Sequence, residues 1–277
     1  MPETLLNIQK LVFAYKNAGQ TLAEVDFAVN TGEFVALVGR NGSGKTTLTR
    51  LAMALIKPAS GTIYFQGKNT ATMTPADMAC GIGYVFQNPD RQIFRDTVAK
   101  EVAYGPQQLG FAPEAVNETV AWALSMTGLT ELAGSFPRLL SRGQKQKVAI
   151  ASAIAMQPKM LILDEPTSGQ DPWDAQNLME LLTNLNQQGI TIILVTHDME
   201  IIAKYATRVA VLDRGHKVFD GTPSELFAGS HDIAAWGLLP PTAVALGQQL
   251  AGVNAQNETE LVQQIMSIIK GRTGDYA

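Results

Sequence analysis

The feature that most constrains this chain is a glycine-rich segment at residues 39–47, with the sequence Gly-Arg-Asn-Gly-Ser-Gly-Lys-Thr-Thr. An apolar run at 34–38 precedes it and a helix-like segment begins at Thr47, so it fits the pattern G-x-x-x-x-G-K-[ST] in the strand, loop and helix setting that this pattern requires. Glycines let successive backbone N–H groups face one concavity, and a helix N-terminus adds its positive dipole there. A surface turn with a chance lysine is the alternative, and the flanking strand and helix argue against it. The sequence therefore predicts a phosphate-binding loop.

Two side chains of this loop have predicted parts in holding a nucleotide. Lys45 is expected to reach the β- and γ-phosphates, and Thr46 to place its hydroxyl on the magnesium ion that accompanies the nucleotide. The loop residues predicted to contact the nucleotide are Gly39, Asn41, Gly42, Ser43, Gly44, Lys45, Thr46 and Thr47.

Charge and cysteine content narrow the class of protein. The chain has 277 residues and a formal net charge of -4, so it lacks the overall basic field that would favour nucleic acid as a partner. Cys80 is its single cysteine, which excludes an internal disulfide and favours a reducing compartment. The start has no basic region followed by an apolar core, so we expect no secretory signal and a cytoplasmic location.

Residues 233–257 carry no charge at all, so a membrane segment is one interpretation of this stretch. Gly237, Pro240 and Pro241 interrupt this stretch, and several amide side chains follow, which makes it too broken and too polar for a spanning helix. A buried or partner-facing segment is the interpretation that we adopt.

Hydrophobic periodicity predicts an α/β chain. Apolar runs at 34–38, 160–163 and 190–195 are typical of parallel strands covered on both faces, whereas 4–15 and 22–29 alternate as half-buried antiparallel strands do. Further strands are predicted at 62–65, 81–86, 208–212 and 216–219, and helices at 97–104, 113–127, 142–156, 172–188 and 222–227, the phosphate-loop helix ending near 56. Breaks are predicted at Gly105-Pro106, Gly128 and Pro137.

The order of these segments predicts the domain organisation. A helical subdomain at about 88–156 is inserted into an α/β domain of residues 1–228, and residues 229–277 form a helical extension. Residues 230–277 look helical throughout, and Leu261, Ile265, Ile268 and Ile269 are expected to share one helix face.

A pair of carboxylates stands where an open parallel sheet presents residues to ligands. Asp164 and Glu165 follow the run at 160–163 and come directly before Pro166. Asp164 is expected to organise a magnesium shell, and Glu165 to orient or polarise the attacking water. A solvated acidic turn is the alternative, and it loses weight because a phosphate loop precedes the pair.

A second candidate site is the start of the helix at 142–156. Ser141 and Gln144 have the spacing of a capping box, which favours a well-started helix. The same helix start, with the Ser141 hydroxyl and the Gly143 N–H, would also bind an anion. The residues alone leave both interpretations open.

Taken in order, these motifs resemble the ATP-binding-cassette (ABC) family of transport ATPases over roughly residues 3–228. The resemblance implies a P-loop NTPase core, with a parallel sheet covered on both faces and an antiparallel β subdomain, and it implies ATP and Mg²⁺ as ligands. The motifs that carry it are an early aromatic at Tyr15, the loop at 39–47, Gln87, the signature at 140–144, Asp164-Glu165, Asp171 and His197.

The resemblance also implies roles for residues that have ordinary alternatives. Tyr15 would stack on adenine, with Phe13 as a rival and a plain strand aromatic as the alternative. Gln87 would sense Mg²⁺ and the γ-phosphate, or be a loop amide. His197 would hold the γ-phosphate, or cap a helix. The residues assigned to catalysis are Glu165, His197, Gln87 and Lys45, and those assigned to the metal are Thr46, Gln87 and Asp164.

The family's geometry implies a dimer, since the signature of one protomer closes over the ATP of the other. Here the signature is formed by Ser141, Arg142, Gly143 and Gln144, and Asp171 belongs to the dimer-contacting D-loop. Arg142 stands where glycine is usual, and Gln170 where leucine is common. Arg142 would add a cation near the partner's nucleotide or point to solvent, and both possibilities stay open.

Residues 85–110 are similar to the ATPase subunits of energy-coupling-factor (ECF) transporters, which import vitamins and metal ions. The similarity implies a transmembrane coupling subunit docked near 87–110, a second ATPase subunit that is identical or related, and a separate membrane subunit that selects the substrate. The alternative is that 87–110 only stabilises the helical subdomain. Residues 229–277 fit the extra helical region of this group, which contributes to ATPase pairing. The expected location is the cytoplasmic face of the cell membrane, with no transmembrane segment.

Three other functions are alternatives to an ECF-type ATPase. Another type of ABC transporter ATPase fits the same motifs. A soluble ABC ATPase acting on nucleic acid or ribosomes usually has two cassettes or a long coiled-coil insertion, and this chain has neither. A non-hydrolysing regulatory cassette is supported by Arg142 alone.

Overall fold

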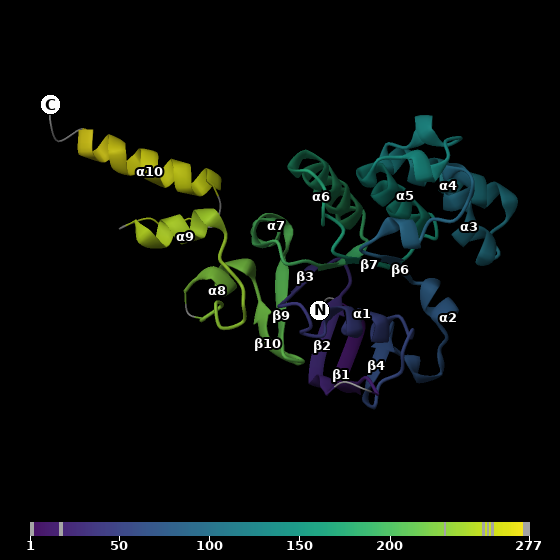
Figure 1. Ribbon diagram of the computed structural model, residues 1–277, viewed down its shortest axis with the longest axis horizontal. Helices are drawn as coiled ribbons and strands as arrows, with labels where there is room; N and C mark the ends of the chain where they lie inside the picture. Colours follow the sequence, from purple (N-terminus) through teal and green to yellow (C-terminus); the bar gives the residue numbers. More distant parts are fainter. Residues whose placement is uncertain are drawn as a thin grey trace.

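The computed structural model describes residues 3–16, 19–229, 231–250, 253, 255 and 258–273. Two sheets lie at its centre, three packed helices cover one end, and the C-terminal helices project from the opposite end (Figure 1). Among the residues so described, no helix is both long and apolar enough to cross a bilayer.

The larger sheet has six strands in the order β10-β9-β3-β8-β7-β6. All neighbours in it are parallel except β9 and β10. Every residue of β3, β6, β7 and β8 is buried, which explains their continuous apolar composition. The strands are β3 (Phe34–Val38), β6 (Ile82–Val85), β7 (Met160–Asp164), β8 (Thr191–Val195), β9 (Arg208–Asp213) and β10 (His216–Gly221).

The smaller sheet is antiparallel and has the order β2-β1-β4-β5. Its strands are β1 (Thr4–Ala14), β2 (Gln20–Asn30), β4 (Ser60–Phe65) and β5 (Lys68–Asn69). Its inner side chains pack with α1 and with one face of the larger sheet in one hydrophobic cluster. The predicted combination of a parallel core sheet with an antiparallel sheet is therefore confirmed.

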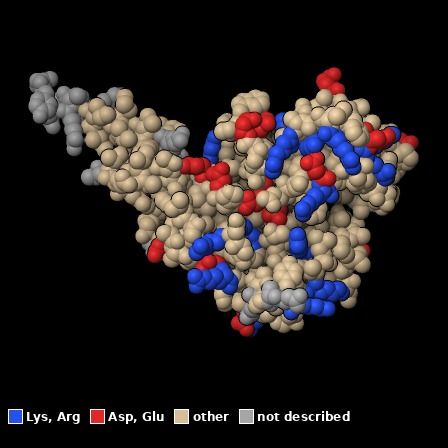
Figure 2. Space-filling view, viewed as in Figure 1, with Lys and Arg blue, Asp and Glu red and all other residues tan. Residues whose placement is uncertain are grey.

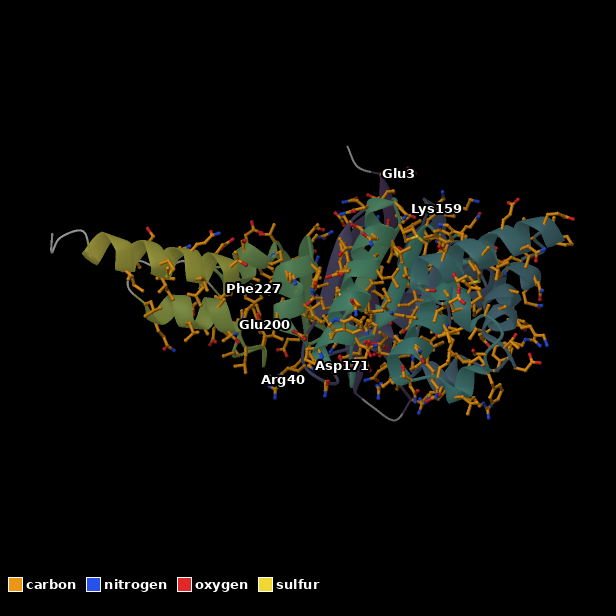
Figure 3. The ribbon with its side chains drawn as sticks, turned by 90° about the horizontal axis from the view of Figure 1, so that it is seen from above. Glu3, Arg40, Lys159, Asp171, Glu200 and Phe227 are labelled. Carbon is orange, nitrogen blue, oxygen red and sulfur yellow. The ribbon has the colours of Figure 1, made fainter. Side chains whose placement is uncertain are left out.

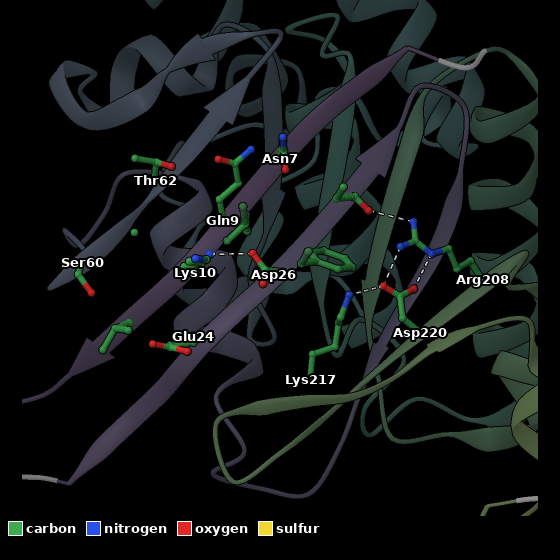
Figure 4. A pocket seen from close by; sticks show the side chains of 15 residues that line it. Asn7, Gln9, Lys10, Glu24, Asp26, Ser60, Thr62, Arg208, Lys217 and Asp220 are labelled. Carbon is green, nitrogen blue, oxygen red and sulfur yellow. Dashed lines mark hydrogen bonds and ion pairs between the residues drawn. The ribbon is translucent and has the colours of Figure 1, made fainter.

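Arg208 on β9 ties the two sheets together (Figure 4). Its guanidinium donates to the Asp220 carboxylate at 2.6 and 2.8 Å, to Glu33 Oε2 at 3.0 Å and to the Ala28 carbonyl on β2 at 2.9 Å. Burial raises the pKa of Asp220, but the bonds from Arg208 and Lys217 outweigh it and leave that pKa below its usual value. The group lines a hollow on the outer side of the antiparallel sheet.

The helices cover both faces of the larger sheet. Helices α3, α4, α5 and α6 pack on one face with β6, β7 and β8 in a second hydrophobic cluster. The bounds are α1 (Lys45–Ala52), α2 (Pro75–Ala79), α3 (Val98–Gln108), α4 (Pro113–Thr127), α5 (Arg142–Ile154), α6 (Pro172–Gln187), α7 (Met199–Tyr205), α8 (Pro223–Phe227), α9 (Thr242–Gln249) and α10 (Glu258–Thr273), with short 3-10 helices η1 (Thr70–Thr72), η2 (Pro89–Arg91), η3 (Thr130–Leu132) and η4 (Pro137–Leu139).

The predicted break at Gly105-Pro106 is wrong, because α3 continues to Gln108. Gly105 serves packing instead: a Cβ there would lie 2.7 Å from the side chain of Met156, at the end of α5. Gly110 (φ +77°) follows the helix and turns the chain in the left-handed conformation typical of a helix end. The phosphate-loop helix ends at Ala52 rather than near 56, since Ala54 has a positive φ of 53°.

The prediction that residues 230–277 are helical is wrong for 231–241, and for residues 230, 251, 252, 254, 256, 257 and 274–277 it lies outside the described part of the chain. Gly237 has a φ of +69° and Pro240 and Pro241 follow it, so the chain forms turns there and α9 begins only at Thr242. In Figure 2 the described side chains of α9 and α10 are almost all uncharged on the face in view.

The predicted apolar face of α10 is confirmed for three residues and wrong for the fourth. Leu261, Ile265 and Ile268 pack with α9 in a small hydrophobic cluster. Ile269 is 51% exposed, because it lies about 100° further round the helix than Ile268.

Candidate nucleotide-binding site

The phosphate loop connects β3 to α1 with the strand and helix that the sequence predicts. Its glycines at 39, 42 and 44 all have positive φ angles. A Cβ on Gly39 would collide with the Leu212 carbonyl of β9, and one on Gly44 would lie 2.6 Å from the Leu22 side chain. Close approach as well as backbone angle therefore requires glycine at these two positions.

Lys45 is held at the centre of this loop. Its Nζ donates to the Gly39 carbonyl at 2.6 Å and to the Arg40 carbonyl at 3.1 Å. The side chain is buried, which lowers its pKa, while the nearby carboxylates of Glu165 and Asp164 act in the opposite direction. The lysine is thus a largely desolvated cation at the centre of the loop, where a phosphate group could pair with it.

Ser43 supplies a second sign that the loop is shaped for an anion. Its Oγ is buried and has no hydrogen-bond partner among the residues described. A buried hydroxyl without a partner is uncommon and costs free energy. A phosphate oxygen would be an acceptor for it.

Asp164 and Thr46 meet as the sequence predicts. The Thr46 hydroxyl donates to Asp164 Oδ2 at 3.0 Å, and the Tyr84 hydroxyl donates to the same oxygen at 3.5 Å. Burial raises the pKa of Asp164, and burial raises the pKa of Tyr84 to about 12, so Tyr84 stays a donor at neutral pH. Tyr84 is a site residue that sequence reasoning missed, because it looks like any aromatic in a buried strand.

Glu165 and His197 lie on neighbouring strand ends and contact each other. His197 Nδ1 is 2.7 Å from Glu165 Oε2, with the Glu165 side chain 13% exposed and that of His197 66% exposed. Glu165 has a φ of +49°, and its N–H donates to the Val195 carbonyl at 2.8 Å. Such a backbone angle on a residue with a side chain is strained and is common at functional sites.

His197 is not the helix cap that was its alternative. Asp198 is the N-cap of α7, because its carboxylate accepts hydrogen bonds from the N–H groups of Glu200 and Ile201. The imidazole of His197 is left to contact Glu165.

Most of the predicted nucleotide-binding and catalytic residues line one cavity of about 500 Å³, whereas Gly39 and His197 line a second cavity and Ser43 lines neither. Tyr15 lies at its edge with its hydroxyl 3.4 Å from Thr47 Oγ1, while its rival Phe13 packs against the core. The lining residues are Tyr15, Thr21, Asn41, Gly42, Gly44, Lys45, Thr46, Thr47, Gln87, Asp164 and Glu165.

The signature residues lie outside this cavity. The Ser141 hydroxyl accepts from Gln144 N–H at 3.3 Å, and Gln144 Oε1 accepts from Ser141 N–H at 3.0 Å, which is the predicted capping box. Arg142 is exposed to solvent and does not line the nucleotide cavity of its own chain. Its guanidinium lies over Gly169, where a Cβ would be 2.9 Å from Cζ.

The D-loop and the signature are therefore packed together within the chain. Asp171 caps α6 by accepting from Asp174 N–H at 2.9 Å, and a Cβ on Gly143 would lie 2.6 Å from Asp174 Oδ2. Gln170 closes the D-loop turn by donating to the Pro166 carbonyl at 2.9 Å.

The segment predicted to meet a membrane partner, residues 87–110, presents aromatic and charged side chains. Phe94 is 56% exposed, and the Arg95 guanidinium lies 5.2 Å from its ring and 4.4 Å from that of Tyr104. Asp90 pairs with Lys145 at 2.9 Å. Glu101 differs: it is buried and accepts from the N–H groups of residues 94 and 95, so its part is structural.

Comparison with protein families places this geometry in a known class. A family model described as "ABC transporter" matches residues 22–168, and a model described as "AAA domain, putative AbiEii toxin, Type IV TA system" matches residues 135–203. The chain is 38% identical over 269 residues to the energy-coupling factor transporter ATP-binding protein EcfA1 of Clostridium perfringens, which covers 95% of each chain. It is 37% identical to EcfA2 of Methanospirillum hungatei, with 97% of this chain and 68% of that one covered.

Other curated relatives are longer. The chain spans 42%, 43% and 44% of the length of ABC transporter ATP-binding proteins from Methanosarcina mazei, Methanosarcina acetivorans and Caldanaerobacter subterraneus.

Two solved structures are similar in fold. CbiO1 of Clostridium perfringens, described as part of the ABC transporter complex CbiONQ, superposes with a TM-score of 0.78 at 34% identity, covering 90% of this chain and 100% of that one. The ATP-binding cassette MJ0796 is described as a dimeric post-hydrolysis state bound to ADP and phosphate. It superposes with a TM-score of 0.71 at 28% identity, covering 79% of this chain and 99% of that one.

Proposed function

Because this chain belongs to the ABC transporter family of ATP-binding proteins, we propose that it is the ATP-hydrolysing subunit of an ECF-type importer. The proposal is supported by its EcfA1, EcfA2 and CbiO1 relatives, which match over most of its length. The single observation that carries the ATPase part is the convergence of Lys45, Asp164 and Glu165 on one cavity.

The residues of the cavity divide the work of phosphoryl transfer. The phosphate loop and Lys45 bind the β- and γ-phosphates, and Tyr15 stacks on the adenine from the edge of the cavity. Glu165 polarises the attacking water from the strand end. His197 orients the Glu165 carboxylate through its 2.7 Å contact and faces the γ-phosphate.

The site also fits a magnesium ion. Thr46 and Asp164 bring a hydroxyl and a buried carboxylate within 3.0 Å, and oxygen ligands of this kind, shared with substrate phosphates, suit Mg²⁺. The raised pKa of Asp164 marks a carboxylate that burial disfavours as an anion and that a cation would stabilise. Thr46 and Asp164 would hold the ion, with Gln87 beside them. When bound, the ion neutralises charge on the phosphates.

Each chain supplies two half-sites. The signature at 141–144 lies outside the chain's own cavity, so it is available to a second ATPase subunit, identical or related, whose nucleotide it covers. Asp171 lies with it on the face that meets the partner. ATP binding closes this dimer and hydrolysis reopens it.

The cycle drives a membrane complex on whose cytoplasmic face the chain is bound. The transmembrane coupling subunit docks at residues 87–110, close to Gln87 in the ATP cavity. A separate membrane subunit selects the cargo, a vitamin or a transition-metal ion. The domain limits proposed are 1–228 for the ATPase domain, with the helical subdomain at about 88–156, and 229–277 for the extension.

The proposal is tested by affinity purification from native membranes, comparing the parent chain with Lys45→Ala. The parent is expected to bring down a transmembrane subunit and hydrolyse ATP. The variant should keep the partner and lose ATP turnover. Lys57→Ala, which removes an exposed lysine amine that donates to Ala71, is the matched control and should behave as the parent. A parent chain with no membrane partner would refute the importer, and full turnover by Lys45→Ala would refute the site.

A further inference from the structure

A second cavity, of about 670 Å³, adjoins the phosphate loop. Three segments line it: residues 39–41 of the loop, residues 197–200 at the start of α7, and residues 237–241 of the C-terminal extension. Figure 3 shows Arg40 and Glu200 together at the place where the extension joins the rest of the molecule. We call residues 237–242 the junction segment.

The first contact of the junction segment is with the phosphate loop itself. A Cβ on Gly237 would lie 2.5 Å from Arg40 Cδ and 2.6 Å from Cγ, so the arginine stem rests directly on the glycine. The backbone of Arg40 matters for the site, because its carbonyl accepts from Lys45 Nζ and from Ser43 N–H, each at 3.1 Å. A displacement of residue 40 therefore reaches two phosphate-binding groups.

The second contact is with the helix that follows His197. Thr242 is the first residue of α9, where a helix leaves its N–H unpaired, and it donates to Glu200 Oε1 at 2.7 Å. Apolar packing reinforces this bond, since Leu238 and Val244 share a buried cluster with Met199. The start of α7 is thereby fixed, and with it the neighbouring His197.

We propose that the junction segment is a positioning element of the ATPase site. Gly237 sets the place of Arg40 and so the rest position of Lys45, while the Glu200–Thr242 bond sets the start of α7 and the contact of His197 with Glu165. The inference rests on the proposed function and deepens it: the extension takes part in nucleotide binding and turnover through its first residues.

The first arm of the test changes Gly237. In Gly237→Ala the new methyl displaces the Arg40 stem, and we expect the Kd for Mg-ATP, measured by equilibrium titration of the full chain, to rise about fivefold, within the range of remote packing changes. Gly229→Ala is the matched control. It has a similar φ of +80°, but its nearest atom is Gln248 Nε2 at 3.9 Å, so it carries the backbone strain without the Arg40 contact. It should lower the melting temperature similarly and leave the Kd unchanged.

Arg40→Ala makes this arm specific, because it removes the Cγ and Cδ that Gly237 contacts. In that background Gly237→Ala should have no further effect on the Kd. The inference is overturned if Gly237→Ala and Gly229→Ala have equal Kd values, or if Gly237→Ala raises the Kd as much without the arginine as with it. A parent chain that does not bind Mg-ATP would instead refute the proposed function on which the inference rests.

The second arm changes Glu200 and is measured on the complete membrane complex. Glu200→Ala frees the Thr242 N–H, so we expect kcat for ATP hydrolysis to fall while the Kd stays unchanged. Glu200→Gln keeps an oxygen acceptor for Thr242 and should restore kcat. Parental kcat in Glu200→Ala, or failure of Glu200→Gln to restore it, would overturn the assignment.

Discussion

Replacement of Glu165 by glutamine separates nucleotide binding from hydrolysis in this site. The change keeps the shape of a side chain that is 13% exposed and replaces one carboxylate oxygen by an amide group. The strained backbone at this residue is held by the bond from its N–H to the Val195 carbonyl, which the substitution leaves in place. We therefore expect the fold, and the melting temperature, to change little.

The expected loss is in turnover. A positioned general base contributes about 10²–10⁴ to a rate, so kcat for ATP hydrolysis should fall by about that factor, or roughly 2.7–5.5 kcal/mol of transition-state stabilisation. The affinity for Mg-ATP should not fall with turnover. The Glu165 charge acts on Lys45, beside the expected phosphates, and its removal lessens repulsion of a polyanion. The Kd for Mg-ATP should stay the same or decrease.

The assay pairs single-turnover hydrolysis with equilibrium binding on the same preparation. Glu180→Gln makes the same chemical change on the exposed side of α6 and serves as the control. Glu165→Gln should bind Mg-ATP and accumulate as a closed dimer in size-exclusion chromatography, whereas the Glu180→Gln control should behave as the parent. Parental kcat in Glu165→Gln would refute the role of this carboxylate, and loss of ATP binding would show that it serves binding rather than hydrolysis.

Three further predictions concern the signature, the sheet junction and the docking segment. Arg142→Gly removes the guanidinium that lies over Gly169, which should loosen the D-loop and lower steady-state ATP turnover several-fold. Equal or higher turnover would show that the Arg142 side chain does not hold the D-loop in place. The pKa of Asp220 is depressed in the folded chain. Its pairing with Arg208 therefore stabilises the fold fully above the pKa of an unfolded aspartate, about 3.9, and this stabilisation is lost as the pH falls through the lower pKa of the folded chain. Asp220→Asn should thus flatten the drop in melting temperature below about pH 4, and an unchanged pH profile would contradict this. Asp90→Lys should weaken co-purification of a membrane subunit while leaving the Kd for ATP intact, whereas loss of ATP binding would make the segment structural.

Most of the strands and the phosphate loop could be predicted because their signals are local. An uninterrupted apolar run such as 190–195 specifies a strand buried on both faces, and the glycine spacing around Lys45 specifies a loop whose N–H groups point inward. Helix ends were predicted less well where packing overrides local preference. Gly105 looks like a break, yet its missing side chain is what allows α3 to approach Met156.

The partners of Arg142 and Glu101 also lay beyond the sequence. Both look like solvated charges on a helical segment. The fold places Gly169 beneath the Arg142 guanidinium, and it wraps the backbone of residues 94 and 95 around the Glu101 carboxylate. No periodic pattern in the sequence predicts either contact.

By itself, the sequence determined the family, the order of the motifs and the residue types that phosphoryl transfer needs, because these are set by short patterns whose chemistry is local. Tertiary structure alone decided which of those residues touch. Glu165 meets His197 because β7 and β8 are parallel neighbours in the register Asp164 to Val195, and Gly237 meets Arg40 because the junction segment lies beside the phosphate loop. Contacts between residues so far apart in the chain depend on the packing of the whole core, which no local pattern encodes.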